Sequence, residues 1–163
     1  MWDWDDGTFS EWLGPFNSGE EVCAAHTWTE GGDYEVRVKA KDEHGAESNW
    51  SEPLLFHVKA PILEVEISGG LGLTLAIRNV GDGDAHNVTW YFSMYGGILG
   101  RINIEEDGFI SMLPAGGEES IVLRKLLFGL GSIEITIEVG ADYIETETVT
   151  ISAFIMGPFI IIV

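Results

Sequence analysis

Hydrophobic and polar side chains alternate along most of this 163-residue chain, and the alternation predicts β-strands. The clearest example covers residues 34–41, where charged side chains share one face and Tyr34, Val36, Val38 and Ala40 share the other. A period of two is that of a strand with one buried and one solvated face. Turns rich in glycine and acidic residues, at residues 30–33 and 42–45, bracket this strand at both ends.

Similar segments predict further strands, and turns rich in Gly, Pro, Asn and Asp separate them. No segment has a helical pattern, and regularly spaced short strands of this kind are typical of β-sandwiches. We expect the additional strands at residues 22–28, 54–58, 63–68, 71–78, 88–94, 101–104, 109–112, 121–126, 133–139, 146–152 and 159–163.

The pattern is interrupted at Lys59-Ala60-Pro61. Because proline fixes φ and favours an extended conformation in the residue before it, this tripeptide predicts a short, stiff connector. The chain is too long for one minimal sandwich and suits two of about 60–100 residues each. The sequence therefore predicts an all-β chain with two antiparallel sandwich domains, residues 1–59 and 60–163.

Composition narrows the range of partners. The formal net charge is −19, from 27 acidic and 8 basic side chains, and such a surface repels nucleic acid and anionic lipid.

Cys23 is the only cysteine, so no disulfide forms within the chain. Residues 1–30 lack the basic start of a signal peptide, and the apolar tail at 151–163 is shorter than the ~20 residues that span a bilayer. We expect a final strand there, and no membrane insertion.

Several ordered motifs in the first half resemble the PKD (polycystic kidney disease) domain family. They are Asp3-Trp4-Asp5-Asp6-Gly7-Thr8, His26-Thr27-Trp28, Gly32-Asp33-Tyr34-Glu35-Val36, and Ala40-Lys41-Asp42 followed by Gly45. Asp5 stands where the family usually has Gly, so we expect that turn to be strained or differently bent. Only Met1 and Trp2 precede the first motif, so we expect an amino-terminally truncated domain with an unpaired edge and an open apolar face.

The second half resembles the Ig-like CARDB-type modules through Asn79-Val80-Gly81, Asn87-Val88-Thr89-Trp90 and residues 113–118. Together the two resemblances imply two tandem antiparallel Ig-like β-sandwiches, the first incomplete. They also imply a non-catalytic extracellular or cell-surface module from the carboxyl-terminal part of a larger exported protein. Its expected role is that of a spacer or a protein or glycan contact, in a monomer unless the exposed edge of the first domain pairs.

Three carboxylates near the amino end are candidate metal ligands. Asp3, Asp5 and Asp6 offer oxygens that suit Ca²⁺, which takes six to eight ligands from a converging loop. The other interpretation of these residues, and of Asp82 and Asp84, is ordinary turn chemistry. A calcium-stabilised structural repeat is therefore one alternative function, and Ca²⁺ is the only cofactor that the sequence suggests.

Aromatic residues suggest a second alternative, a carbohydrate-binding accessory module of a secreted hydrolase. Trp12, Phe16, Trp28 and Trp50 suit stacking on sugars, although core packing is the other use of such side chains. Asn49-Trp50-Ser51 and Asn87-Val88-Thr89 fit the N-glycosylation pattern.

No motif of a known catalytic class is present. There is no HExxH, GxSxG, P-loop or CxxC pattern. Cys23 and His26 lie three residues apart on an expected strand, which places their side chains on opposite faces. They therefore cannot form a catalytic dyad. We therefore expect no catalytic residue.

Overall fold

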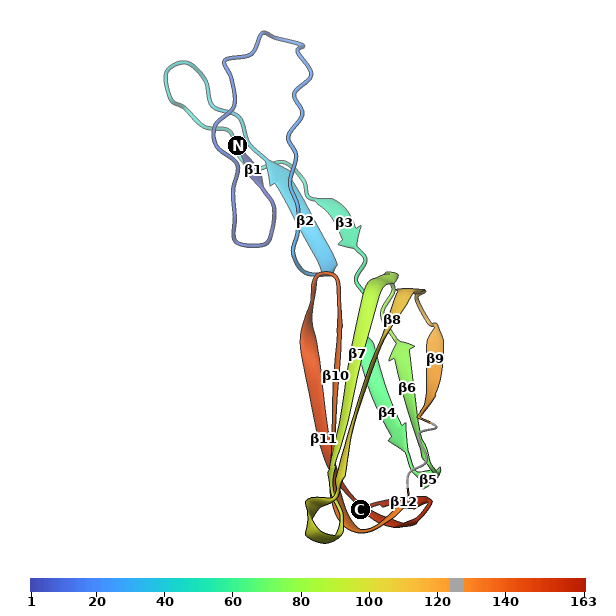
Figure 1. Cartoon of the computed structure of the whole chain (residues 1–163). Coiled ribbons are helices and arrows are strands. Elements are labelled where there is room, and N and C mark those ends of the chain that lie inside the picture. The colour runs from blue at the N-terminus through green and yellow to red at the C-terminus, as the bar shows by residue number, and fades with distance from the viewer. Residues whose placement is uncertain (124–127) are drawn as a thin grey trace. The chain divides into compact units, whose positions relative to one another are not determined.

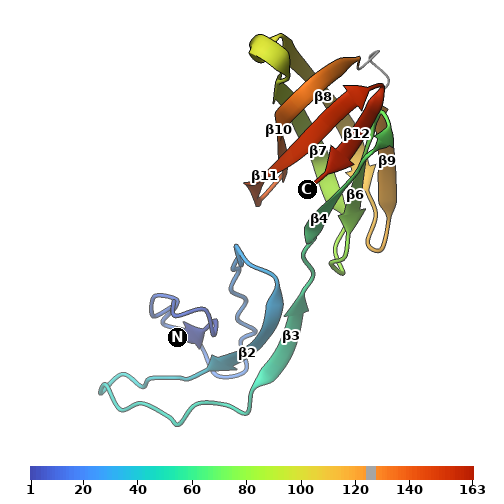
Figure 2. The same cartoon turned by 90° about the horizontal axis from the view of Figure 1, so that it is seen from below.

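The computed structural model describes residues 1–123 and 128–163, which form two compact units, Met1–Lys59 and Ala60–Val163. The chain is all-β with antiparallel sheets, as predicted (Figures 1 and 2). The one helical element in the described residues is a short 3-10 turn, η1 (Ile98–Gly100). None of the described helical segments is long and apolar enough to cross a membrane. The boundary between the units falls at the predicted connector.

The first unit is built on a single three-stranded sheet, in the order β1 (Trp2–Asp3), β2 (Gly32–Val38), β3 (Leu54–Val58). The strand expected between its two turns is β2, so that prediction is confirmed, as is β3. Long loops fill the rest of the unit, and Trp4 and Val36 are its only buried hydrophobic residues. The fold of this unit therefore depends on contacts between loops and one sheet.

The prediction of a strand at residues 22–28 is wrong. Exposure does alternate there, with Val22, Ala24, His26 and Trp28 half-buried and the residues between them exposed. The segment forms no β-ladder with any described strand, however. In this segment the sequence pattern reports correctly which side chains face inward, but a strand also needs a hydrogen-bonding neighbour.

The second unit has two antiparallel sheets, which Figures 1 and 2 show as separate layers. The smaller sheet has the order β4 (Leu63–Ser68), β6 (Leu73–Asn79), β9 (Glu118–Leu123). The larger sheet has six strands in the order β5 (Gly70–Leu71), β12 (Phe159–Ile162), β11 (Ile144–Gly157), β10 (Gly129–Ala141), β7 (Ala85–Gly96), β8 (Ile102–Leu113).

One hydrophobic core lies between these two layers. The small sheet contributes alternate residues of β6, such as Leu75 and Ile77, and the large sheet contributes alternate residues of β7 and β10, such as Phe92 and Ile135. All four are almost completely buried. Because burying each such side chain stabilises a fold by about 1.5–3 kcal/mol, this sandwich-like packing holds the unit together.

Several strand boundaries in this unit differ from the prediction. Residues 71–78 split at Gly72, whose φ of 89° turns the chain from one sheet into the other. The segments predicted at 101–104 and 109–112 are one continuous strand, β8, and β11 is longer than expected. The apolar tail ends in β12, as predicted. The predicted strand 121–126 is confirmed as far as Leu123, and its remainder lies outside the described residues.

Candidate functional site

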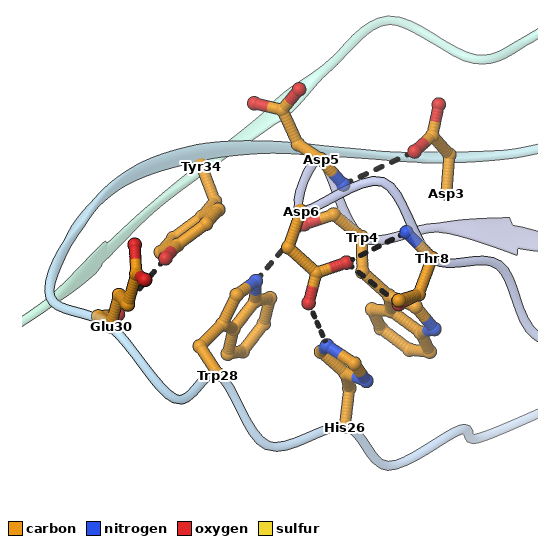
Figure 3. A network of polar contacts seen from close by, with 9 residues as sticks. All are labelled: Asp3, Trp4, Asp5, Asp6, Thr8, His26, Trp28, Glu30 and Tyr34. Carbon is orange, nitrogen blue, oxygen red and sulfur yellow. Dashed lines mark hydrogen bonds and ion pairs between the residues drawn. The ribbon is translucent and has the colours of Figure 1, made fainter.

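The three amino-terminal carboxylates lie in one tight turn, residues 3–8, here called the aspartate turn (Figure 3). Asp3 Oδ1 accepts the backbone N–H of Asp5 at 3.1 Å. Asp6 Oδ1 accepts the N–H of Thr8 at 3.0 Å and its hydroxyl at 2.6 Å. Such bonds from an aspartate to the backbone two residues on are the usual chemistry of a turn.

Asp5 occupies a left-handed conformation with φ of 61°. This region favours glycine, and Asp and Asn tolerate it better than other residues. The turn therefore has the backbone conformation that a glycine would adopt there. Asp5 Oδ2 also accepts the N–H of Glu35 at 2.8 Å, which fastens the turn to β2.

His26 closes the aspartate turn from the other side (Figure 3). Its Nε2 lies 2.7 Å from Asp6 Oδ2, and its ring stacks on Trp4 with 4.7 Å between centroids. Trp28 meets His26 edge-on and donates its indole N–H to the carbonyl of Trp4 at 3.0 Å. The loop that ends at Trp28 is thus held to the turn by one carboxylate, one carbonyl and three rings.

The electrostatics of this cluster favour a structural role. The hydroxyl of Thr8, and after it His26, lower the pKa of Asp6 from 3.8 to about 2. A general base works best with a pKa near the operating pH, and both oxygens of Asp6 already accept hydrogen bonds. A hollow of about 490 Å³ lies beside the cluster, between Thr8, His26 and Tyr34.

The calcium candidates do not form a common ligand set. Asp3, Asp5 and Asp6 bind three separate backbone N–H groups. Across residues 1–123 and 128–163, no three His, Cys, Asp or Glu side chains converge in a way that suits a metal ion. The calcium interpretation stays a prediction from the sequence.

Two of the predicted ligand contacts, Trp12 and Phe16, line an apolar groove of about 190 Å³. We call it the Trp12 groove. Its remaining walls come from Met1, Trp2, Leu13, Val22, Val38, Lys39, Ala40 and Lys41. Trp50 lies outside the groove and packs at a tilt against Phe9, with 6.3 Å between ring centroids.

Lys39 links these aromatic residues. Its ammonium lies 4.8 Å from the ring centroid of Trp50 and 5.7 Å from that of Trp12, and Lys41 lies 4.4 Å from the Trp12 centroid. Lys39 also donates to Glu47 at 2.5 Å, and this bond lowers the pKa of the glutamate. Trp12, Phe16 and Trp50 are therefore neighbours, but cations occupy part of the ring surface.

The two lysines are functional candidates that sequence reasoning missed. Two features of the sequence could have indicated them. Lys39 and Lys41 lie on the same face of the alternating segment, and the aromatic residues before residue 17 need a surface to pack against. Trp28, by contrast, belongs to the His26 cluster and to a stack with Phe56, not to the groove.

In the second unit the notable polar residue is Asn79, which is only 1% exposed. Its Nδ2 donates to the carbonyls of Gly83 and Leu113 at 2.8 and 3.0 Å. Its Oδ1 accepts from the N–H groups of Ile62 and Gly81 at 3.2 and 3.1 Å. One side chain thus ties the turn after β6 to the connector and to the end of β8.

Asp82 and Asp84 act in the same turn. Asp82 Oδ1 accepts the N–H of Ala60, and Asp84 Oδ1 accepts the N–H of Ala115, both at 3.0 Å. They were predicted as turn residues, but their bonds reach segments far away in the sequence. Gly81 is required beside them, since a Cβ there would lie 2.3 Å from the carbonyl oxygen of Ala60.

The two candidate glycosylation sites differ. Asn49 is exposed in the loop before β3. Asn87 is also exposed, but its Nδ2 donates to Asp142 at 2.6 Å and its φ is 53°. A glycan on Asn87 would replace one of the two amide hydrogens, and the other could still donate to Asp142. Cys23 is a free, exposed thiol.

Comparisons with known proteins identify no family for this chain. The chain matches no protein-family model, and no curated protein sequence is significantly similar to it. The membership of the first half in the PKD family, and of the second in the CARDB-type modules, therefore stays a prediction from the motifs.

Proposed function

We propose that this chain is a non-catalytic module from the carboxyl-terminal part of a larger exported protein, located outside the cell or at its surface. In this proposal it consists of two tandem Ig-like domains, the first incomplete, and serves as a spacer that also presents a contact surface. The observation that carries the proposal is the use of the polar side chains. Asp6, His26, Asn79, Asp82 and Asp84 all fasten loops.

The spacer role is supported by how the connector enters the second unit. Besides the side chains of Asn79 and Asp82, backbone hydrogen bonds hold the connector. The carbonyl of Ala60 accepts the N–H groups of Asp82 and Gly83, and the carbonyl of Ile62 accepts the N–H of Val80. A spacer transmits position only if its attachment point is held firmly. Residues 60–62 have that support within their own unit.

The proposal is tested by incubating the full chain with broad panels of peptide and glycan substrates. We expect no turnover above that of a heat-denatured sample. Turnover that Asp6→Asn or His26→Gln abolishes in a folded variant would contradict the non-catalytic role. For the spacer role, backbone ¹⁵N relaxation should show residues 60–62 as ordered as the strands, and ns motion confined to them would contradict it.

A glycan contact is the second candidate, and the Trp12 groove favours it. Aromatic walls suit the apolar face of a sugar ring, and Lys41 beside Trp12 suits a carboxylate on that sugar. A glycan array is the direct test, with acidic sugars expected to bind best. Trp12→Ala should remove the signal, whereas Tyr143→Ala, at a fully exposed aromatic residue of the other unit, should not.

A further inference from the structure

The strand β3 is the most exposed apolar element of the first unit. Leu54, Leu55 and Phe56 are 66%, 73% and 47% exposed, although they are the first three residues of a regular strand. Because neighbours in a strand point to opposite faces, apolar surface is open on both sides of β3. Buried strands are apolar on both faces, whereas a strand that ends a sheet is usually protected by charge or proline.

β3 also lies at the edge of its sheet. The order is β1-β2-β3, and among the described strands β3 pairs with β2 alone (Figure 1). In an antiparallel sheet every second residue of an edge strand directs its N–H and C=O groups away from the sheet. β3 therefore combines open backbone groups with exposed apolar side chains, which is the surface to which another strand adds.

We propose that β3 is a self-association edge, on which β3 of a second copy of this chain adds antiparallel about a two-fold axis. A two-fold axis perpendicular to the sheet places a residue opposite itself, so the contact is isologous and closed. With Leu55 on the axis, the two three-stranded sheets join into one. Leu55 then meets Leu55 of the second copy, and Leu54 meets Phe56.

This register is selected by the side chains. Moving the axis to Phe56 would place Leu55 opposite the polar His57, whereas the axis at Leu55 gives Leu54, Leu55 and Phe56 an apolar neighbour each. The flanking charges agree with the antiparallel direction. Exposed Glu52 and Lys59 lie at opposite ends of β3, and each Glu52 comes within one residue of Lys59 of the second copy.

A second copy suits this edge better than a different acidic or basic protein. The segment 52–59 carries one acidic and one basic side chain in a chain of net charge −19, so it is locally almost neutral. When a second copy of the strand lies antiparallel to the first, the negative end of each copy lies near the positive end of the other. Repulsion between the remaining acidic surfaces opposes the contact, so raising the salt concentration should strengthen it.

The test is sedimentation equilibrium of the full chain from about 5 to 500 μM, in low and in ~0.5 M salt, conditions chosen because the Debye length falls to a few ångströms. We expect a monomer–dimer equilibrium that salt favours. Leu55→Lys should weaken association at least tenfold, because it places two ammonium groups together on the axis. Leu71→Lys is the matched control, since Leu71 is 79% exposed on β5, an edge strand of the other unit.

Disulfide trapping tests the register separately. Residues directly opposite in an antiparallel pair have Cα atoms about 4.5–5.5 Å apart, within the range that a disulfide spans. Leu55→Cys in a Cys23→Ser background should therefore form a covalent dimer on oxidation, and Leu71→Cys in the same background should not. Tryptophan fluorescence of each variant verifies that the first unit remains folded.

Three results would overturn the proposal. The first is a single monomeric species at every concentration and salt level. The second is a dimer that Leu55→Lys leaves intact or that Leu71→Lys abolishes. The third is equal trapping through positions 55 and 71, which would indicate non-specific association. If a different protein binds β3 while the chain alone stays monomeric, the edge has another occupant and the proposal is wrong.

Discussion

Replacing Asn79 by Ala tests the central polar contact of the second unit. The side chain is almost completely buried and makes four hydrogen bonds, to Gly83, Leu113, Ile62 and Gly81. At about 0.5–1.5 kcal/mol for each bond, the substitution should cost roughly 2–6 kcal/mol of the free energy of unfolding. That is a large part of the ~5–15 kcal/mol that stabilises a domain.

Differential scanning calorimetry of the full chain measures this effect. The lower part of that range, about 2–4 kcal/mol, corresponds to a fall in Tm of roughly 10–20 °C for a unit of this size. Asn103→Ala is the control, because Asn103 is exposed on β8 and surface changes of this kind alter stability by about 0.5 kcal/mol or less. A Tm for Asn79→Ala within about 2–3 °C of the wild-type value would refute the reasoning, because the loss of four bonds should lower the Tm by about 10 °C or more.

Three other outcomes follow from the structure. Gly108→Ala should lower the Tm of the second unit, because the new Cβ would lie 2.4 Å from the ring of Trp90, which is directly opposite on β7. An unchanged Tm would show that the indole moves freely. Ionised Asp6 stabilises the first unit above pH ~4, since folding lowers its pKa from 3.8 to about 2. This contribution should disappear as the pH falls from about 4 to 2, and a fluorescence-detected stability that stays constant over that range would contradict it. If the aspartate turn is only structural, neither Ca²⁺ nor EDTA should change the Tm, and a Ca²⁺-dependent rise would revive the calcium interpretation.

The sequence predicted most of the sheet structure because alternation reports burial directly. β2, β6 and β10 were placed from the period-two pattern alone. In β6 and β10 the inward residues are the buried ones, and in β2 Val36 is buried while Tyr34 and Val38 are half-buried. The pairing of strands was harder to predict from the sequence. Residues 22–28 have the pattern of a strand but no hydrogen-bonded neighbour. The segment that forms β8 was divided in two because Glu106 and Gly108 interrupt the apolar run on its half-buried face.

The candidate site was predicted only in part, since contacts between distant segments leave no periodic trace. Trp12 and Phe16 were expected together and do share a groove. The bond between Asp6 and His26 joins residues 20 apart, and Asn79 reaches Leu113 over 34 residues. No spacing rule predicts such pairs, because the path of the loops decides them.

The central claim is that the conspicuous polar side chains hold the fold and carry out no chemistry. Asp6→Asn tests it most directly, with the exposed Glu21→Gln as control. Denaturant unfolding followed by tryptophan fluorescence reports mainly on the first unit, which contains every tryptophan except Trp90. The account predicts that Asp6→Asn lowers the denaturant midpoint and that Glu21→Gln does not. A midpoint for Asp6→Asn that is unchanged or raised would contradict the account, since catalytic residues, unlike structural ones, are commonly replaced without loss of stability.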